Sequence, residues 1–273
     1  MIQRIVPSSG EQIPILGLGT WKTFDISSSP DALKPLSEVL DIMQESGGAV
    51  IDSSPMYGKS ETTIGLLTAD IPARHNFFYA TKVWTSGKQE GIQQMNESFL
   101  RMKRDTMDLM QIHNLSDWKT QIKTLREWKA EGKIRYIGIT HYTDAMHEEL
   151  ERVFSSEAID FVQFNYSIFS RHAEQRLLQA AADHGVATMI NRPLGEGRGL
   201  SKIAHLELPD WAKENGIDSW SQFALLYLTL HPAVTVIIPA TGNPLHAREN
   251  YRTNDVMPDF SFRKQMLDYI NQL

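Results

Sequence analysis

The sequence predicts an α/β fold, a (β/α)8 TIM barrel in a single domain, from three observations. Eight short apolar segments alternate along the chain with amphipathic segments of helical spacing. The length of 273 residues suits this architecture, which typically needs about 250. No linker, low-complexity tract or charge run divides the chain, so we expect residues 1–273 to form one domain.

The elements are expected in a regular order that begins with a β-hairpin at residues 2–16. The barrel strands are expected at residues 15–21, 49–54, 77–84, 108–114, 134–141, 160–167, 186–193 and 234–240. The clearest helical segments lie between them, at residues 30–46, 88–103, 118–132 and 174–185. Several of these segments end at Gly or Gly-Lys, as helix stop signals do. Residues 259–273 are expected to form an accessory helix outside the barrel.

A doubly wound sheet is the competing α/β arrangement. Its nucleotide fingerprint, GxGxxG, would follow the first strand. The glycines of Gly17-Leu-Gly19 do not complete that pattern, because Lys22 occupies the third glycine position. The missing fingerprint and the count of eight strands both favour the barrel.

Composition excludes several classes of function. A net charge of −6 argues against nucleic acid or an anionic membrane as a general partner, since both favour basic patches. No apolar run approaches the roughly 18 residues that span a bilayer, and the first residues lack a signal-peptide core, so a cytoplasmic protein is expected. No exposed apolar stripe requires an oligomer, so a monomer is expected. The chain has no cysteine, and His147-Glu148 lacks a second histidine at helical spacing. We therefore expect no metal cofactor.

Polar residues end three consecutive expected strands. Asp52, Lys82 and His113 stand at these ends, and Tyr57 follows Asp52 closely. Neighbouring parallel strands lie about 4.8 Å apart, so these side chains should converge on one patch. A lysine cation lowers the pKa of a nearby phenol from its ordinary value near 10 toward neutral. Each residue alone is better explained as a cap or a solvated strand end, but together they predict a proton-donating site.

This order and spacing resemble the aldo-keto reductase family, from the opening hairpin to Asn250. The resemblance implies an NAD(P)H-dependent reductase that transfers hydride from nicotinamide to aldehydes and ketones. It also implies that Tyr57 is the general acid, that Lys82 and Asp52 tune its acidity, and that His113 orients the substrate carbonyl. In such a site Gly19, Thr20 and Asp52 would approach the cofactor.

The resemblance also implies a substrate pocket formed by Trp21, Trp84 and Asn114. The alternative for Trp21 is an ordinary core indole. Residues 259–273 leave little chain for the long carboxyl-terminal loop that narrows the pocket in many relatives. We therefore expect an open site that accepts small aldehydes, ketones or sugar-derived carbonyls.

The nicotinamide end of the cofactor would meet residues that depart in part from the family pattern. Thr140, His141 and Gln163 stand where Ser, Asn and Gln usually hold the carboxamide. Threonine keeps the hydroxyl, whereas histidine can donate one hydrogen bond. Asn191 and Arg192 stand where a stacking tyrosine and a serine are common. Because a guanidinium is planar, Arg192 could replace the stacking ring in part.

Residues 195–200 follow the seventh strand and the pair Pro193-Leu194. Gly195 and Gly197 would let the backbone approach a pyrophosphate, which Arg198 could pair with. Barrel phosphate sites tend to lie after strands seven and eight, which favours this interpretation over a flexible loop.

The eighth strand runs into a segment that resembles the family's adenosine-phosphate loop. The contacts implied there are Ile238, Pro239, Thr241, Asn243 and, at the adenine, Asn250. Asn243 before a proline predicts an N-cap, and the helix start that follows suits a phosphate. Ala240 and His246 replace the lysine and arginine that usually recognise the 2′-phosphate. We therefore expect the protein to prefer NADP(H) over NAD(H), but with lower selectivity than the usual lysine and arginine would give.

Two other classes of function remain open from the sequence. One is a cofactor-independent barrel enzyme in which Lys82 forms a Schiff base, although the paired Asp52 argues against it. The other is a nucleotide-binding regulatory subunit that turns over slowly, although the chain has no extra docking segment.

Overall fold

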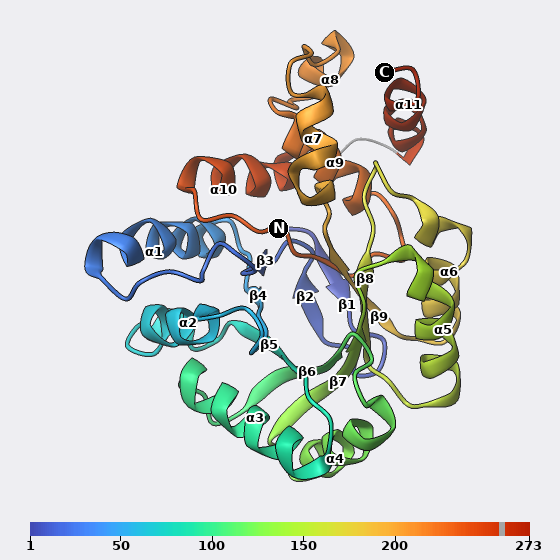
Figure 1. Cartoon of the computed structure of the whole chain (residues 1–273). Coiled ribbons are helices and arrows are strands. Elements are labelled where there is room, and N and C mark those ends of the chain that lie inside the picture. Colours follow the sequence, from blue (N-terminus) through green and yellow to red (C-terminus); the bar gives the residue numbers. More distant parts are fainter. Residues whose placement is uncertain (257–259) are drawn as a thin grey trace.

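The computed structural model describes residues 1–256 and 260–273 and is a parallel β-barrel surrounded by helices (Figure 1). The eight strands follow one another in chain order around the sheet, and adjacent strands are parallel. They are β3 Leu18–Gly19, β4 Val50–Asp52, β5 Phe78–Val83, β6 Met107–His113, β7 Ile134–Thr140, β8 Phe161–Asn165, β9 Ala187–Asn191 and β10 Val236–Ile237. The prediction of a (β/α)8 barrel is confirmed.

The barrel closes between its first and last strands. Parallel bridges join Leu16 to Ile237 and Gly19 to Ala240. The backbone N–H of Gly19 donates to the carbonyl of Pro239 at 3.1 Å. A Cβ on Gly19 would lie only 2.9 Å from the carbonyl oxygen of Ile238, so glycine permits this close approach.

Helices cover the outside of the barrel (Figure 1). They are α1 Pro30–Glu45, α2 Ser60–Thr68, α3 Lys88–Met102, α4 Trp118–Ala130, α5 His147–Ser156, α6 Leu177–Asp183, α7 Arg198–Ile203, α8 Asp210–Glu214, α9 Trp220–Thr229, α10 Pro244–Tyr251 and α11 Phe260–Ile270. The accessory helix is therefore present as α11, although position 259 of the expected segment lies outside the described residues.

The amino-terminal hairpin consists of β1 Gln3–Ile5 and β2 Gln12–Pro14, which pair antiparallel. Val6 and Ile13 from this hairpin are buried in one apolar cluster with the side chains that fill the barrel. The strand residues of that cluster are Val50, Phe78, Ala80, Leu109, Tyr136, Phe161, Ala187, Met189, Val236 and Ile238. The hairpin thus covers the interior at the end where the strands begin.

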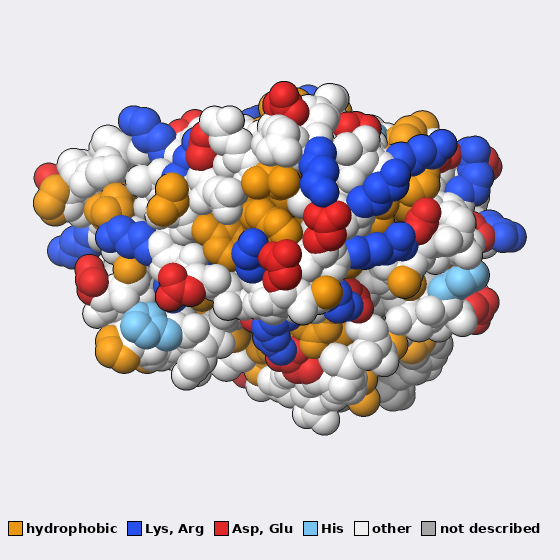
Figure 2. Space-filling view, turned by 90° about the horizontal axis from the view of Figure 1, so that it is seen from below, with side chains coloured by type: hydrophobic (Ala, Val, Ile, Leu, Met, Phe, Trp, Pro, Cys, Tyr) orange, Lys and Arg blue, Asp and Glu red, His pale blue; other side chains and the backbone are white. Residues whose placement is uncertain are grey.

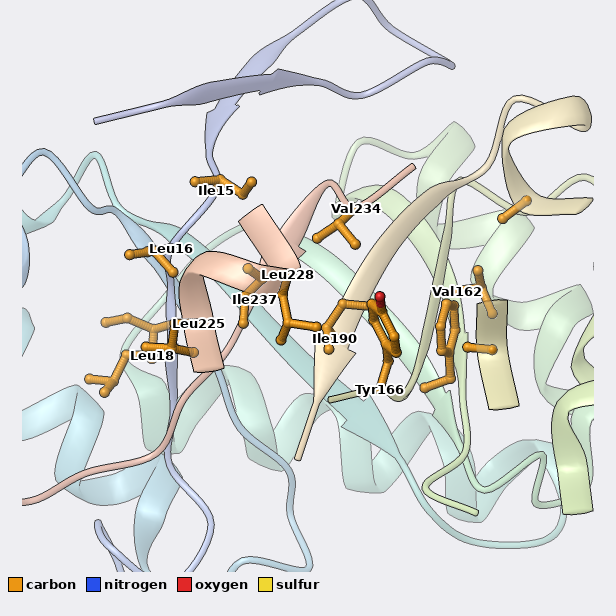
Figure 3. Close-up of a cluster of buried hydrophobic side chains, with 14 of the residues drawn as sticks. Ile15, Leu16, Leu18, Val162, Tyr166, Ile190, Leu225, Leu228, Val234 and Ile237 are labelled. Carbon is orange, nitrogen blue, oxygen red and sulfur yellow. The ribbon is translucent and has the colours of Figure 1, made fainter. Parts of the chain in front are cut away.

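A second and larger cluster fills the space between the barrel and the helices. Figure 3 shows Leu225 and Leu228 of α9 lying beside Ile237 and Ile190 on the outer faces of β10 and β9. Alternate side chains of a strand point to opposite faces, so each strand from β4 to β10 contributes to both clusters.

Charged side chains of both signs are interspersed on the face shown in Figure 2, with hydrophobic side chains between them. Ion pairs such as Lys88–Glu127 and Arg126–Glu157 join neighbouring elements at the surface. Within the described residues, the helices are all too short or too polar to cross a membrane.

Candidate active site

The carboxyl ends of β4, β5 and β6 bring three ionisable residues together, as the sequence predicted. Asp52 and His113 are the last residues of β4 and β6, and Lys82 is the penultimate residue of β5. All three side chains are buried, Lys82 completely. They share one patch because adjacent parallel strands end on the same face of the barrel.

Asp52 and Lys82 form a buried ion pair. The Nζ of Lys82 donates to Asp52 Oδ2 and to the backbone carbonyl of Ser53, both at 2.7 Å. Burial lowers the pKa of Lys82, but the Asp52 carboxylate and the Tyr57 phenol more than offset this effect and raise it above its ordinary value. Lys82 is therefore held as a cation.

The other carboxylate oxygen of Asp52 accepts hydrogen bonds from two glutamine amides, only one of which the sequence predicted as a site residue. Gln111 Nε2 donates to Asp52 Oδ1 at 2.8 Å, and Gln163 Nε2 donates to the same oxygen at 2.9 Å. Gln163 was predicted as a cofactor contact, whereas Gln111 was missed. A glutamine between the buried apolar residues Met110 and Ile112 is the signal that would have found it, since a buried amide needs partners.

Tyr57 lies in the turn after β4, next to this ion pair. Its backbone N–H donates to the carbonyl of Ser54 at 3.0 Å. The Lys82 Nζ lies 4.9 Å from the centre of the Tyr57 ring. The Tyr57 and His113 rings are nearly perpendicular, with centres 5.8 Å apart. All four predicted residues therefore meet in one place.

The pKa of Tyr57 differs from the prediction. The sequence predicted a pKa lowered toward neutral by Lys82. Burial instead raises the pKa of the Tyr57 phenol above its ordinary value, and the Lys82 cation lowers it only in part, because Asp52 works in the opposite direction. The prediction was wrong because the cost of burying a phenolate cannot be read from spacing.

His113 is held in a single orientation by a serine. Its Nδ1 lies 2.9 Å from Ser54 Oγ, which also accepts the backbone N–H of Met56 at 3.3 Å. Burial, reinforced by the Lys82 and His141 charges, lowers the pKa of His113 to about 3, so the imidazole is neutral. Ser54 was missed by sequence reasoning, because nothing in its spacing distinguishes it from an ordinary turn serine.

The expected nicotinamide contacts lie beside this patch, at the ends of the next three strands. Thr140 Oγ1 donates to Gln163 Oε1 at 3.1 Å. Asn191 Nδ2 donates to the carbonyl of His141 at 3.2 Å. The Oδ1 of Asn191 is buried and has no hydrogen-bond partner among the residues that the structure describes. The Oδ1 of Asn191 is thus available to accept a hydrogen bond from a ligand.

Arg192 is engaged by its neighbours. Its guanidinium carbon lies 4.3 Å from the centre of the Tyr142 ring, and it forms an ion pair with Glu196 at 2.8 Å. The His141 ring also stacks on the Tyr142 ring, with ring centres 5.2 Å apart. Arg192 therefore already stacks on a protein ring.

Two segments are expected to bind phosphate, residues 195–200 and the start of α10. Residues 195–200 are not a simple loop, because Gly195–Gly197 form a 3₁₀ turn and Arg198 begins α7. Both glycines have positive φ values, 63° and 79°, which favour glycine. This turn follows Pro193 and Leu194 directly.

The α10 segment confirms the predicted cap. Asn243 Oδ1 accepts the backbone N–H of Leu245 at 3.0 Å, and the helix starts at Pro244. Thr241 Oγ1 accepts the N–H of Asn243 at 3.0 Å, and Asn250 is buried within the helix. Ala240 and His246 are exposed.

The expected pocket residues lie at the rim. Trp21 and Trp84 are 38 % and 43 % exposed, so Trp21 is not an ordinary core indole. The Trp84 and His113 ring centres are 6.2 Å apart. Asn114 follows His113 with a φ of 53°, and its buried Oδ1 is unpartnered within the described part of the chain. Thr20, near this rim, donates to the carbonyl of Asp52 at 3.0 Å.

A sequence model of the Aldo/keto reductase family matches residues 15–273, which is nearly the whole chain. The chain belongs to the aldo/keto reductase family. Members of this family are NAD(P)-dependent oxidoreductases that act on carbonyl groups. The resemblance to this family that the sequence predicted is thereby confirmed.

Individual relatives are distant in sequence. An aldo-keto reductase of Mycobacterium avium (strain 104) is 29 % identical over 196 residues, which are 68 % of this chain and 64 % of that relative. Methylglyoxal reductase YeaE of Escherichia coli (strain K12) is 27 % identical over 263 residues, covering 92 % of this chain and 89 % of YeaE.

Solved structures of the family share the fold. An aldo-keto reductase from Klebsiella pneumoniae in complex with NADPH superposes with a TM-score of 0.83 at 24 % identity. The superposition covers 99 % of this chain and 96 % of the Klebsiella chain. At this identity the likeness shows the fold alone, a barrel of eight parallel strands surrounded by helices.

Proposed function

We propose that this chain is an NAD(P)H-dependent reductase of small aldehydes and ketones with Tyr57 as the general acid. The observation that carries the proposal is the meeting of Asp52, Tyr57, Lys82 and His113 at the carboxyl ends of the strands. Active sites of TIM barrels lie at this face.

Each residue has a protonation state that suits a reduction. The raised pKa of Tyr57 keeps the phenol protonated at neutral pH, so that it can donate a proton to the developing alkoxide. Lys82, held charged by Asp52, stabilises the phenolate that proton donation leaves behind. If the hydroxyl of Ser54 donates to Nδ1 of the neutral His113, the imidazole N–H is on Nε2, available to the carbonyl oxygen.

The residues present fit a nicotinamide cofactor. The unpartnered Oδ1 of Asn191 is an acceptor for an amide N–H, and the neighbouring Thr140 and Gln163 offer further polar atoms. The backbone amides at the start of α10 suit a phosphate. When bound, the nicotinamide supplies the hydride for the carbonyl carbon.

We propose NADP(H) over NAD(H), with a small preference because Ala240 and His246 replace the usual cations. The Klebsiella relative was solved with NADPH. Titrating the protein with NADPH and NADH while following tryptophan fluorescence tests this choice. We expect tighter binding of NADPH by less than about tenfold, since a paired surface charge contributes up to about 1 kcal/mol. Equal binding, or a preference for NADH, would overturn it.

A Schiff-base role for Lys82 is disfavoured by its surroundings. The amine is fully buried, hydrogen-bonded to Asp52 and Ser53, and has a raised pKa, so it is not a free nucleophile. Borohydride in the presence of substrate is expected to leave no adduct on Lys82.

Replacing Tyr57 with phenylalanine tests the general acid. We expect Tyr57→Phe to lower kcat by about 10²–10⁴-fold while cofactor binding persists, because only proton donation is lost. Tyr269→Phe, in the outlying α11, is the matched control and should keep normal turnover. Methylglyoxal and other small aldehydes are the first substrates to assay, since YeaE is a methylglyoxal reductase. Near-normal turnover of folded, cofactor-bound Tyr57→Phe would contradict the proposal.

A further inference from the structure

A cluster of two histidines and an aspartate lies beside the candidate active site, in the loops that follow β7 and β8. Asp144 begins the 3₁₀ turn Asp144–Met146, His147 is the first residue of α5, and His172 begins the 3₁₀ turn His172–Gln175. One ligand atom from each of these residues lies within 4.8 Å of the others. We propose that Asp144, His147 and His172 form a binding site for a divalent transition-metal ion such as Zn²⁺.

The sequence did not point to this cluster. His147 has no histidine partner at helical spacing within its own helix, and His172 lies 25 residues further along the chain. The two meet because parallel strands β7 and β8 end side by side, so that their following loops are neighbours.

His147 has the orientation and the tautomer that a metal ligand needs. Its side chain is 3 % exposed and packs edge-on against Phe164, with ring centres 5.6 Å apart. Its Nε2 lies 3.1 Å from Asn165 Oδ1, and the Asn165 amide is oriented because its Nδ2 donates to Asp144 Oδ1 at 2.5 Å. Nε2 of His147 is therefore the donor, which leaves the lone pair on Nδ1. Metal-ligating histidines are commonly held through their second nitrogen in this way.

That lone pair faces a second imidazole nitrogen. His147 Nδ1 and His172 Nδ1 are 3.0 Å apart, and His172 supplies the proton between them. Two nitrogens that bind Zn²⁺ tetrahedrally at about 2.0–2.1 Å lie about 3.3 Å apart. An ion could thus replace the shared proton if the two nitrogens separated by about 0.3 Å, while the proton moves to the other nitrogen of His172. His172 is exposed, so it has room to make this movement.

Asp144 supplies the third ligand. One of its carboxylate oxygens lies within 4.8 Å of a nitrogen of each histidine, and its carboxylate accepts the hydroxyl of Ser170 at 3.2 Å. Ligating carboxylates are typically supported by such hydrogen bonds. Two imidazoles and one carboxylate, with water as the fourth ligand, suit Zn²⁺ and its neighbours better than Mg²⁺ or Ca²⁺. A bound ion would link the loop after β7 to the loop after β8, close to His141.

Titration of the chelator-treated, full-length protein with ZnCl₂ tests the proposal. We expect binding of one Zn²⁺ per chain by calorimetry, and Co²⁺ should give the visible absorption of a low-symmetry, four-coordinate site. Removing a group that only orients a ligand costs about 10- to 100-fold in metal affinity, so His172→Ala and Asp144→Asn should each cost at least that much. His205→Ala, an exposed histidine in another loop, is the matched control and should bind Zn²⁺ normally.

The exposed position of His172 makes folding of His172→Ala the expected result, and a thermal unfolding curve checks it. If that variant did not fold, Asp144→Asn would provide the same comparison. The proposal is overturned if the wild-type protein does not bind Zn²⁺. It is also overturned if both variants bind as tightly as His205→Ala, because the ion would then lie elsewhere.

Discussion

Hydrogen bonds to both charged and neutral partners hold the individual residues of the candidate active site. Asp52 divides its two oxygens between the Lys82 cation and two glutamine amides. Removing one partner of a buried ion pair costs about 3–5 kcal/mol, because the other charge stays behind without compensation. We therefore expect the same residues to contribute both to the proposed proton donation by Tyr57 and to the stability of the barrel.

Ser54 is predicted to be a positioning residue, acting through His113. Ser54→Ala removes the hydroxyl that faces His113 Nδ1. Losing one such hydrogen bond costs about 1 kcal/mol, so we expect kcat/KM to fall about fivefold while cofactor affinity is unchanged. Steady-state kinetics measures this fall, and ¹H–¹⁵N correlation spectra should show His113 losing its preference for the Nε2–H tautomer.

Ser156→Ala is the matched control for Ser54→Ala, because its exposed hydroxyl bonds only to carbonyl groups of its own helix. It should leave both readouts unchanged. A Ser54→Ala variant with normal kinetics and an unchanged His113 tautomer would remove Ser54 from the mechanism.

The neutral state of His113 predicts how stability depends on pH. The pKa of His113 is about 3 in the folded protein, because of burial, and about 6.5 in the unfolded chain. Above pH 6.5 both states are neutral. As the pH falls below 6.5 the unfolded chain binds a proton that the folded protein does not, so stability is lost progressively down to about pH 3.

Comparison of the wild type with His113→Gln isolates this contribution, since the other buried histidines remain in both proteins. Between pH 6.5 and 4 the wild type should lose up to about 1.4 kcal/mol of unfolding free energy per pH unit more than the variant. Urea unfolding at several pH values measures the difference. Parallel curves would show that His113 is protonated in the folded protein.

At the scale of elements, the packing of β6 against β7 depends on a glycine. A Cβ on Gly138 would lie 2.7 Å from Gln111 Cγ, 3.1 Å from Leu109 Cδ1 and 3.3 Å from the carbonyl oxygen of Phe161. Gly138→Ala would therefore push Gln111 away from Asp52. We expect a loss of about 1–3 kcal/mol of unfolding free energy, measured by urea denaturation.

A double-mutant cycle checks the cause of this loss. Gln111→Ala removes the atom that the new methyl group would meet, so the double variant Gly138→Ala, Gln111→Ala should lose less stability than the sum of the two single variants. Strictly additive losses would mean that the strain lies against the Leu109 side chain or the backbone of Phe161 instead.

The sequence predicted the site residues whose position depends on where strands end. It did not predict the features of the site that depend on packing in the folded interior. Asp52, Lys82 and His113 follow from strand order, because parallel strands end together. Gln111, Ser54 and the direction of the Tyr57 pKa depend on distances and burial that spacing does not encode. The meeting of His147 with His172 depends on two loops, and loop conformation is the part of a barrel that the alternation of strands and helices specifies least.

At the scale of the whole molecule, the two ends of the barrel differ in the kind of side chain that they carry. The carboxyl ends of the strands hold the polar residues, whereas the other end is covered by the amino-terminal hairpin and filled with apolar side chains. Substitutions at these two ends should therefore separate activity from stability.

Ile13 tests this separation, because it is 2 % exposed and belongs to the cluster that fills the barrel. Ile13→Ala is expected to lower the unfolding free energy by about 2–5 kcal/mol, through lost apolar burial and the cavity left behind. At a temperature well below unfolding, kcat/KM should be unchanged. Ile5→Ala on the same hairpin, at a side chain that is 57 % exposed, is the control and should change stability by no more than about 0.5 kcal/mol. If kcat/KM fell together with stability in Ile13→Ala, the closed end of the barrel would be coupled to the site at the open end, because the side chains between them are packed in one continuous column.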